Sequence, residues 1–379
     1  MQNPTPKHFK PRRRFRWRVF LAWTFFLLLT VGGASAAYAY YTAKSSIDKT
    51  FSAAQGAKTT EISSTKPISI LLMGTDTGAL GRTDKGRTDT MMVVTINPKT
   101  KKSTMVSIPR DTLVKVAGTN DTEKINAAYT IGGATTAMKT VENLLNIPIN
   151  YYVTINMGGL EKVVNEIGGI DVKVPFSWTD SHTHMSFKKG NAHLNGKQAL
   201  AFARMRYEDP NGDYGRQKRQ QQVIQQIVKK VTKSGNVSMY RKLLTLLSNN
   251  MKTNLSFSNM VSLAENDKDS VKKVKKSTLK GVGAYIDEQS FQVPTTSALQ
   301  KTSNLLRKAL NLSTESLNNF NTKENKLNTA NGFDWNGNNP DYTVYDSTSS
   351  TSDSSNNTST NDANTAPSGG QQPVVNSGY

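Results

Sequence analysis

The sequence predicts an α/β domain, because strand patterns and amphipathic helix patterns alternate along its middle. Three β-rich apolar runs come first, at Ile68–Met73, Thr90–Ile96 and Thr104–Ile108. The first run is apolar throughout, which predicts a strand buried on both faces. Apolar residues at helical spacing then alternate with further strand patterns, an order typical of a sheet covered by helices.

Each opening run has charged residues at one end, where a strand has no structural use for them. Asp76 follows the first run, Arg87 and Asp89 precede the second, and Arg110 and Asp111 follow the third. A turn signal separates the second run from the third. If these two runs pair as a hairpin, Asp89 and Arg110 meet at one edge of the sheet. Asp76 joins them if its glycine-rich loop folds back.

The charged residues at these strand ends predict a site for a pyrophosphate. Paired carboxylates suit a hard cation such as Mg²⁺, and arginine side chains suit phosphate oxygens. The alternative is a surface ion-pair cluster without a ligand, because structural networks also gather opposite charges. A phosphate-binding loop is excluded, since no Gly-Lys-Ser/Thr follows the glycines Gly74, Gly78 and Gly81.

The remaining elements are predicted from periodicity. Helices are expected at Ala134–Leu145, Gly158–Ile167, Tyr240–Leu247 and Ser297–Leu310, and strands at Tyr151–Ile155 and Ile170–Val174. Residues 175–195 form a polar segment that is expected to be a mobile loop beside a site. This segment contains His182, His184 and His193. A His-x-His pair can bind zinc, but no third ligand is evident, so a metal role is the weaker interpretation.

A second group of charges follows in a segment whose residues alternate. Ala199–Tyr207 is predicted to be a strand that places Arg204 and Arg206 on one face. Two like charges side by side repel each other unless an anion lies between them. The next predicted helix carries Arg216 and Gln220 one turn apart near its N-terminus, where backbone amides favour anions. A solvated basic face is the alternative, but it does not account for a matched pair on a strand.

The composition limits the partners and the chemistry. A formal net charge of +20 implies an anionic partner, whether nucleic acid, a membrane surface or a phosphate-bearing polymer. The chain has no cysteine, which excludes disulfides, thiol catalysis and cysteine metal sites.

The N-terminal segment predicts a membrane anchor. Lysines and arginines crowd between Lys7 and Arg18, and no charged residue occurs from Val19 to Ala43. That stretch is about the length of a bilayer-crossing helix, and aromatic residues lie near both of its ends. By the positive-inside rule, the chain after it is extracellular. The alternative is a cleaved signal peptide, since Ala34-Ser35-Ala36 resembles a cleavage site.

These patterns divide the chain into five parts. Residues 1–18 are a basic cytoplasmic segment, 19–43 a transmembrane signal anchor, 44–66 an extracytoplasmic stalk, 67–315 the globular domain, and 316–379 a linker and tail. From about Ala330 the tail is rich in Ser, Thr, Asn and Gly and too polar to bury a core. It is therefore expected to be disordered.

Eight motifs follow one another after the N-terminal span. They read LLMGTDT, RTDTMM, INPKTKKSTMVSIPRDT, KINAAY, NYYVTINMGGL, EIGGIDV, LNGKQALAFARMR and GRQKRQQ. Together they resemble the LytR-CpsA-Psr family of Gram-positive cell-wall enzymes over roughly residues 67–315. The resemblance implies an αβα fold, in which helices flank a central mixed sheet and a hydrophobic tunnel takes a polyprenyl chain.

The resemblance also implies an activity. Members of this family transfer teichoic acids, capsular polysaccharides or similar glycopolymers from undecaprenyl pyrophosphate to peptidoglycan, and they release undecaprenyl phosphate. The expected cofactor is Mg²⁺, with Mn²⁺ as the alternative. The expected partners are the lipid-linked glycopolymer, peptidoglycan and the cell membrane, which the chain crosses once, and no nucleic acid is expected.

The family pattern also assigns roles to charged residues of this chain. Asp76 and Asp89 are expected at the metal. The pyrophosphate is expected to be surrounded by Arg87, Arg110, Arg204, Arg206, Arg216, Arg219 and Gln220. Arg87, Arg110 and Asp111 are expected to take part in catalysis. Because no histidine lies where a general base is needed, Asp111 or a metal-free oxygen of Asp89 is expected to serve as the base.

Two other functions stay open at this point. The protein could bind or regulate lipid-linked polymer without reacting it, or it could be a polyprenyl-pyrophosphate pyrophosphatase that uses water as acceptor. The acidic pair favours an enzyme, because a binder of pyrophosphate needs arginines but gains less from Mg²⁺. No readable motif indicates which polymer is transferred.

Overall fold

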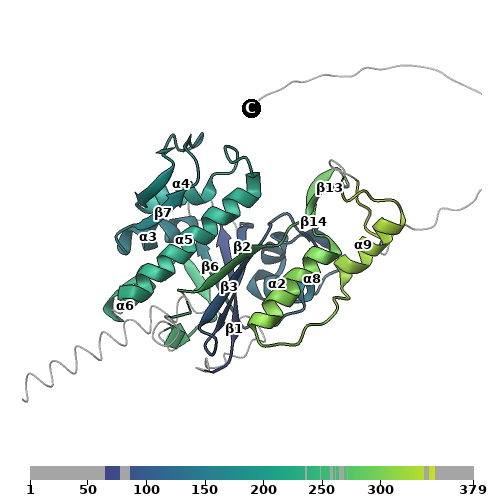
Figure 1. Ribbon diagram of the computed structural model, residues 1–379, viewed down its shortest axis with the longest axis horizontal. Coiled ribbons are helices and arrows are strands. Elements are labelled where there is room, and N and C mark those ends of the chain that lie inside the picture. Colours follow the sequence, from purple (N-terminus) through teal and green to yellow (C-terminus); the bar gives the residue numbers. More distant parts are fainter. Residues whose placement is uncertain are drawn as a thin grey trace, which may run out of the picture. The chain divides into compact units, whose positions relative to one another are not determined.

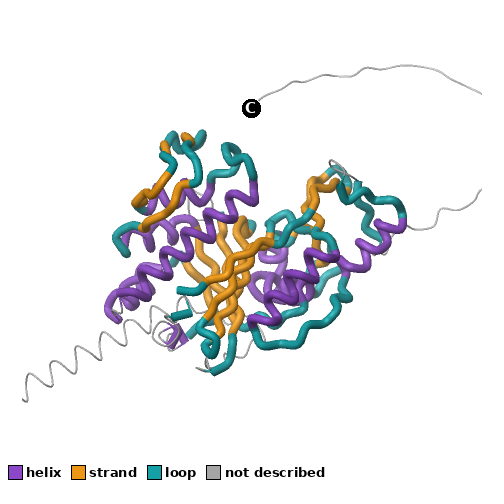
Figure 2. Tube along the Cα trace, in the orientation of Figure 1, coloured by secondary structure: helices purple, strands orange, loops and turns teal. Residues whose placement is uncertain are grey.

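The computed structural model describes residues 65–76, 86–234, 237–247, 249–256, 259–260, 262–263, 269–270, 272–336 and 341–345. At its centre is a six-stranded sheet, drawn in orange between two groups of helices in Figure 2. The strand order is β11-β6-β1-β2-β3-β12. The bounds are β1 Ile68–Thr75, β2 Thr88–Asn97, β3 Lys102–Ile108, β6 Tyr151–Asn156, β11 Met251–Thr253 and β12 Val274–Thr278. The sheet is mixed, because β1 runs antiparallel to β2 but parallel to β6.

Helices lie on both sides of this sheet (Figure 1). On one side are α3 Met157–Glu166, α4 Gly196–Arg204, α5 Gly212–Ser234 and α6 Val237–Leu247. On the other are α2 Ala127–Leu145 and α8 Thr296–Ala309, with α9 Phe320–Ala330 beyond them. Small two-stranded sheets pair β4 Leu113–Lys115 with β5 Thr122–Lys124, β7 Ile170–Val174 with β10 Gly190–Leu194, β8 Trp178–Thr179 with β9 Ser186–Phe187, and β13 Val282–Ile286 with β14 Gln289–Val293. The predicted α/β class and central mixed sheet are confirmed.

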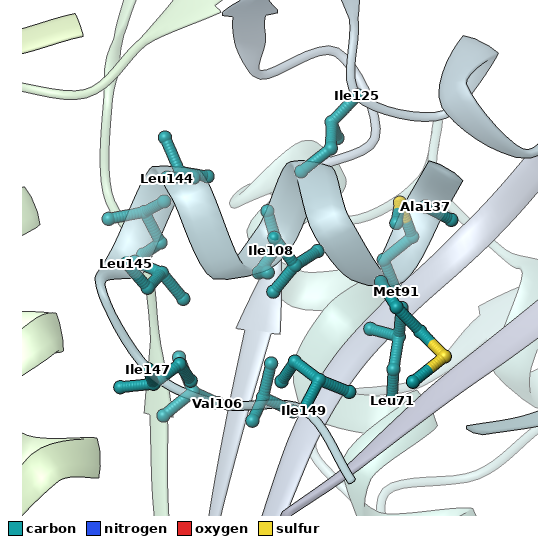
Figure 3. Close-up of a cluster of buried hydrophobic side chains, with 14 of the residues drawn as sticks. Leu71, Met91, Val106, Ile108, Ile125, Ala137, Leu144, Leu145, Ile147 and Ile149 are labelled. Carbon is teal, nitrogen blue, oxygen red and sulfur yellow. The ribbon is translucent and has the colours of Figure 1, made fainter. Parts of the chain in front are cut away.

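The face of the sheet toward α2 and α8 is filled with apolar side chains (Figure 3). Leu71, Met91, Val106 and Ile108, from the three central strands, are each at most 2% exposed and pack with Leu145 of α2. Burying one such side chain contributes about 1.5–3 kcal/mol. This face is therefore the main hydrophobic core of the domain.

One predicted element is wrong. Ala199–Tyr207 is not a strand, because residues up to Arg204 form α4. The helix begins with a reciprocal cap: the Asn195 side chain accepts from the Gln198 N–H at 3.0 Å, and the Gln198 side chain accepts from the Asn195 N–H at 3.0 Å. This capping box and the strong helix propensity of Ala and Leu outweigh a short alternation. Arg204 therefore ends a helix, and Arg206 lies in the segment after it.

The fold also extends past the predicted boundary at residue 315. After α9, Tyr342 is 3% exposed, and its hydroxyl donates to Asn325 Oδ1 at 2.7 Å. Its ring meets the Phe333 ring edge-on, with centroids 5.1 Å apart. The expectation of disorder from Ala330 is thus wrong for residues 330–336 and 341–345, because a few aromatic residues in a polar segment complete a small core.

The predicted cytoplasmic segment and membrane span, residues 1–43, lie outside the described residues, as does nearly all of the predicted stalk. Residues 346–379 also lie outside them. Within the part of the chain that the structure describes, no helix is both long enough and apolar enough to cross a membrane.

Candidate active site

The predicted meeting of Asp89 and Arg110 is confirmed by the register of the β2–β3 hairpin. Met91 pairs with Ile108, so Asp89 and Arg110 lie side by side, each two residues further from the turn. Their side chains form an ion pair in which Arg110 donates to Asp89 Oδ1 at 2.7 Å. Asp111 approaches the same guanidinium, with its Oδ2 3.5 Å from Arg110 Nε. Burial alone would lower the pKa of Arg110, but the hydrogen bond and charge of Asp89 outweigh it and raise that pKa.

Arg216 joins this pair from the start of α5. Its side chain is only 8% exposed, lies 2.6 Å from Asp213 Oδ1, and donates to the Asp89 carbonyl oxygen at 3.3 Å. Burial lowers the pKa of the Arg216 guanidinium, and the charge of Asp213 partly offsets this. The nearby charges of Arg110 and Arg206 lower it further. The guanidinium groups of Arg110 and Arg206 are therefore close enough to repel that of Arg216. An anion between them would relieve this repulsion.

A cavity of about 940 Å³ lies on the face of the sheet opposite the filled core. Most of its wall is apolar and comes from β1, β6, α3, α5 and α6, including Leu72, Val153, Ile155, Leu160, Val223, Ile227, Val231, Leu243 and Leu247. The polar part of its wall includes Asp89, Arg110, Arg204, Arg206, Arg216 and Gln220. The cavity can thus hold a long apolar chain together with an anionic group.

Helix α5 sets the direction of this cavity. Arg216 and Gln220 line it near the helix N-terminus, and Val223, Ile227 and Val231 line it further along. At 1.5 Å rise per residue, the step from Arg216 to Val231 spans about 22 Å. The apolar stripe of α5 therefore borders a channel that leads away from the arginines.

A sequence model of the LytR_cpsA_psr family matches residues 34–308. The chain belongs to the LytR-CpsA-Psr family. The polyisoprenyl-teichoic acid–peptidoglycan teichoic acid transferase TagU of Enterococcus faecalis is 47% identical over 268 residues, which cover 70% of this chain and 88% of that protein.

Solved structures share the fold. Protein gbs0355 from Streptococcus agalactiae matches with a TM-score of 0.62 and 42% identity, over 67% of this chain and 91% of that one. A structure of TagT bound to LIIa-WTA matches with a TM-score of 0.58 and 29% identity, over 68% of this chain and 98% of that one. The fold of this chain is therefore shared with solved proteins that match it over two thirds of its length.

The structure gives Arg219 a different environment from the other arginines of the site. Its side chain is buried, pairs with Asp209, and donates from Nε to the Phe202 carbonyl oxygen at 2.9 Å. Its guanidinium also lies over the Trp178 ring, 5.6 Å from the centroid. These contacts join α4, α5 and the segment that carries Arg206. The geometry therefore makes Arg219 a positioning residue and does not place it among the described residues that line the cavity.

The other predicted residues divide into two groups. Arg204, Arg206 and Gln220 line the cavity with Arg110 and Arg216, and Arg204 is largely exposed. Arg87 is exposed immediately before β2. It is not among the described residues that line the large cavity. Sequence reasoning missed Asp209 and Asp213, the partners of Arg219 and Arg216. The i,i+3 spacing of Asp213 and Arg216 was the available signal.

The carboxylates expected at the metal lie at the same end of the sheet. Thr75, the last residue of β1, pairs with Thr88, the first residue of β2. Asp76 therefore lies just beyond this end of the strand pair, and Asp89 is the second residue of β2. Within the described residues, no group of three or more His, Asp and Glu side chains could hold a metal ion by itself.

The three histidines of the 175–195 segment do not form a zinc site in the described structure. His193 pairs with Asp171 at 2.7 Å, whereas the His182 ring stacks beside Tyr207 with centroids 6.0 Å apart. His182 also lines the large cavity, so part of this segment lies beside the candidate site. The prediction of a loop is wrong for much of the segment, because it contains β8 and β9, and most of its end forms β10.

Proposed function

We propose that this protein transfers an anionic glycopolymer from a polyprenyl pyrophosphate to a sugar hydroxyl of peptidoglycan and releases polyprenyl phosphate. One observation carries the proposal: an apolar cavity of about 940 Å³ has four arginines, Arg110, Arg204, Arg206 and Arg216, in its wall together with Asp89. A polyprenyl pyrophosphate has the same two parts, a long apolar chain and a doubly phosphorylated end. The transferase name of the 47% identical relative supports glycopolymer transfer and favours a teichoic acid as the polymer.

The arginines would bind the phosphates and stabilise charge during transfer. Phosphoryl transfer concentrates negative charge on the phosphate oxygens, and preorganised donors in a site shielded from water lower the energy of that state. Arg216 is held by Asp213 and by the Asp89 carbonyl oxygen, so its guanidinium is fixed before substrate arrives. Arg110 is fixed in the same way by Asp89.

The side-chain chemistry of Asp76 and Asp89 suits a Mg²⁺ ion, because both supply carboxylate oxygens. Magnesium in phosphate sites commonly takes one or two carboxylates and completes its octahedron with water and phosphate oxygens, so two carboxylates at one sheet end are sufficient. These two residues would hold it, with Mn²⁺ as the alternative. When bound, the ion would neutralise charge on the phosphate oxygens.

The reaction needs a group that accepts the proton of the attacking hydroxyl. The hydroxyl oxygen forms a bond to the phosphorus that carries the glycopolymer, and the bond from that phosphorus to the polyprenyl phosphate oxygen breaks. Asp111 would accept the proton, because it is paired less tightly with Arg110 than Asp89 is. Its Oδ2 lies 3.5 Å from Arg110 Nε, whereas Asp89 Oδ1 lies 2.7 Å from Arg110 Nη1. The predicted span at residues 19–43 would keep the domain at the membrane that contains the lipid donor.

The test is a transfer assay with a short-chain prenyl pyrophosphate-linked glycan, purified peptidoglycan strands and Mg²⁺. Arg110→Ala should reduce turnover on the order of 10²-fold or more, as expected for loss of one charge-stabilising donor. Arg110→Lys should restore little, because a point charge cannot reproduce the two-pronged guanidinium contact. Lys218→Ala, on the exposed side of α5, removes the same charge away from the cavity and should keep wild-type turnover.

The same assay separates the alternatives. Wild-type turnover by Arg110→Ala would exclude the site assignment. Release of prenyl phosphate without peptidoglycan strands, at the same rate as with them, would indicate a pyrophosphatase, and binding without any product would indicate a non-catalytic binder.

A chelator should stop transfer and added Mg²⁺ should restore it, and unchanged transfer in the chelator would remove the metal from the proposal.

A further inference from the structure

A second, smaller cavity of about 200 Å³ lies beside the large one. Four segments surround it: the residues after β3, the segment between α4 and α5, the first turn of α5, and β14 of the β13–β14 hairpin. Its wall includes Asp111, Arg206, Asp213, Tyr214, Ser290 and Gln292. Its volume corresponds to about six or seven water molecules at ~30 Å³ each, which is space for one sugar ring but not for a lipid chain.

Hydrogen bonds join three of these segments: the residues after β3, the start of α5 and the β13–β14 hairpin. The Gln292 N–H donates to the Asp111 carbonyl oxygen at 2.8 Å, which holds β14 against the end of β3. The Tyr214 hydroxyl accepts from the Gly281 N–H at 3.0 Å and lies 2.9 Å from Gln292 Oε1, to which it can donate. These contacts hold α5 against the same hairpin. The small cavity is therefore a built feature of the fold.

The two cavities are separated by the arginine–aspartate pairs of the site. Arg110 lines the large cavity, and its neighbour Asp111 lines the small one. Arg216 likewise lines the large cavity, and its partner Asp213 lines the small one. Arg206 lines both. Arg110 and Arg216 thus face the large cavity together with Asp89, whereas Asp111 and Asp213 face the small one.

The geometry of phosphoryl transfer gives this arrangement a consequence. The attacking and leaving oxygens lie roughly in line on opposite sides of the phosphorus. The leaving polyprenyl phosphate belongs to the large apolar cavity, so the attacking hydroxyl should arrive from the opposite side of the arginines. We propose that the small cavity is the acceptor subsite and takes the peptidoglycan sugar that carries this hydroxyl, an inference that rests on the proposed function.

The two carboxylates of the small cavity then have different roles. Asp213 is engaged twice, with Arg216 at 2.6 Å and with Gln217 Nε2 at 2.6 Å, so it orients Arg216. Asp111 has the longer ion pair, 3.5 Å from Arg110 Nε. Asp111 therefore accepts the proton as the hydroxyl oxygen bonds to phosphorus and the polyprenyl phosphate leaves. Gln292 and Ser290 contact the sugar ring as neutral hydrogen-bonding groups.

The experiment blocks the small cavity from its exposed rim. Ser290→Tyr places a ring in the opening, and Gln289→Tyr places the same ring one residue earlier, on the opposite face of the hairpin. With the short-chain donor and soluble peptidoglycan strands, Ser290→Tyr should raise the KM for the strands tenfold or more. The donor KM should stay within about twofold, and Gln289→Tyr should match wild type in both.

A second variant covers the case in which Ser290→Tyr disturbs the hairpin. Tyr214→Phe keeps the ring but removes the hydroxyl's hydrogen bonds to Gln292 and to the Gly281 N–H, and it should raise the KM for the strands severalfold with the donor KM unchanged. A rise in the donor KM alone would overturn the proposal, because the small cavity would then hold a sugar of the donor. Equal kinetics for Ser290→Tyr and Gln289→Tyr would overturn it as well. If wild-type protein transfers no polymer, the proposed function itself fails, and this outcome is visible before any variant is compared.

Discussion

The two faces of the central sheet are built from the same strands but differ in what covers them. On one face Leu71 and Ile108 pack against the helices behind them and are at most 2% exposed. On the other face Leu72 and Val153 line a cavity of about 940 Å³. Alternate residues of a strand point to opposite faces, so one apolar run supplies both surfaces.

This difference shows that an apolar face need not be a packed core. Side chains that border empty space lose the dispersion contacts that a filled core provides. Keeping such a face therefore costs stability, and the cost is offset when an apolar ligand fills the space. We interpret the filled face as the source of stability and the hollow face as the binding surface for the lipid chain.

The sharpest test of this comparison uses neighbouring residues of β1. Leu71→Ala, on the filled face, should lower the free energy of unfolding by about 2–5 kcal/mol, because it opens a cavity in a packed core. Leu72→Ala should lower it by much less, because its side chain already borders open space. Chemical denaturation of both variants measures the two values. Equal losses would contradict the distinction between the faces.

A second test fills the hollow face. Ile227→Trp places a large ring in the cavity about 16 Å along α5 from Arg216, at 1.5 Å per residue. It should raise the KM for a long-chain prenyl donor tenfold or more, which is about 1.4 kcal/mol of binding. The KM for a donor with one or two isoprene units should stay unchanged, because the chain of this donor ends before Ile227.

Lys229→Trp is the matched control, since Lys229 is exposed on the same helix. Lys229→Trp should leave the KM unchanged for both the long-chain and the short-chain donor. If Ile227→Trp affects short and long donors equally, the cavity does not hold the chain in the proposed direction.

Sequence reasoning was most successful where strands end in charged residues. The apolar runs and the turn between them predict the hairpin, and the hairpin alone brings Asp89 to Arg110. It failed for the secondary structure around Arg204 and Arg206, because the alternation of nine residues was given more weight than the Asn195–Gln198 cap. The buried environment of Arg219 was not predictable, since it depends on a tertiary contact with Asp209.

The hollow face could not be recognised from residue patterns either. A strand buried in a core and a strand beside a lipid cavity have the same apolar residues, so periodicity does not distinguish them. The tunnel was expected only because of the family resemblance. The small cavity had no sequence signal at all, because its wall combines segments around Asp111, Asp213 and Ser290 that are far apart in the chain.

The smallest expected effect concerns the small core around Tyr342, near the C-terminal end of the described domain. Tyr342 donates to Asn325 Oδ1 at 2.7 Å and is 3% exposed, whereas Tyr345 is 41% exposed. Tyr342→Phe should lower the free energy of unfolding by about 1 kcal/mol, because it removes one buried hydrogen bond and leaves the Asn325 oxygen without that donor. Tyr345→Phe should leave it unchanged.

Deletion of residues 347–379 should also leave the free energy of unfolding and the transfer rate unchanged, because the small core ends before residue 346. Urea denaturation of the three proteins measures these differences, and a loss of stability in the deletion equal to that of Tyr342→Phe would place part of the tail in the fold.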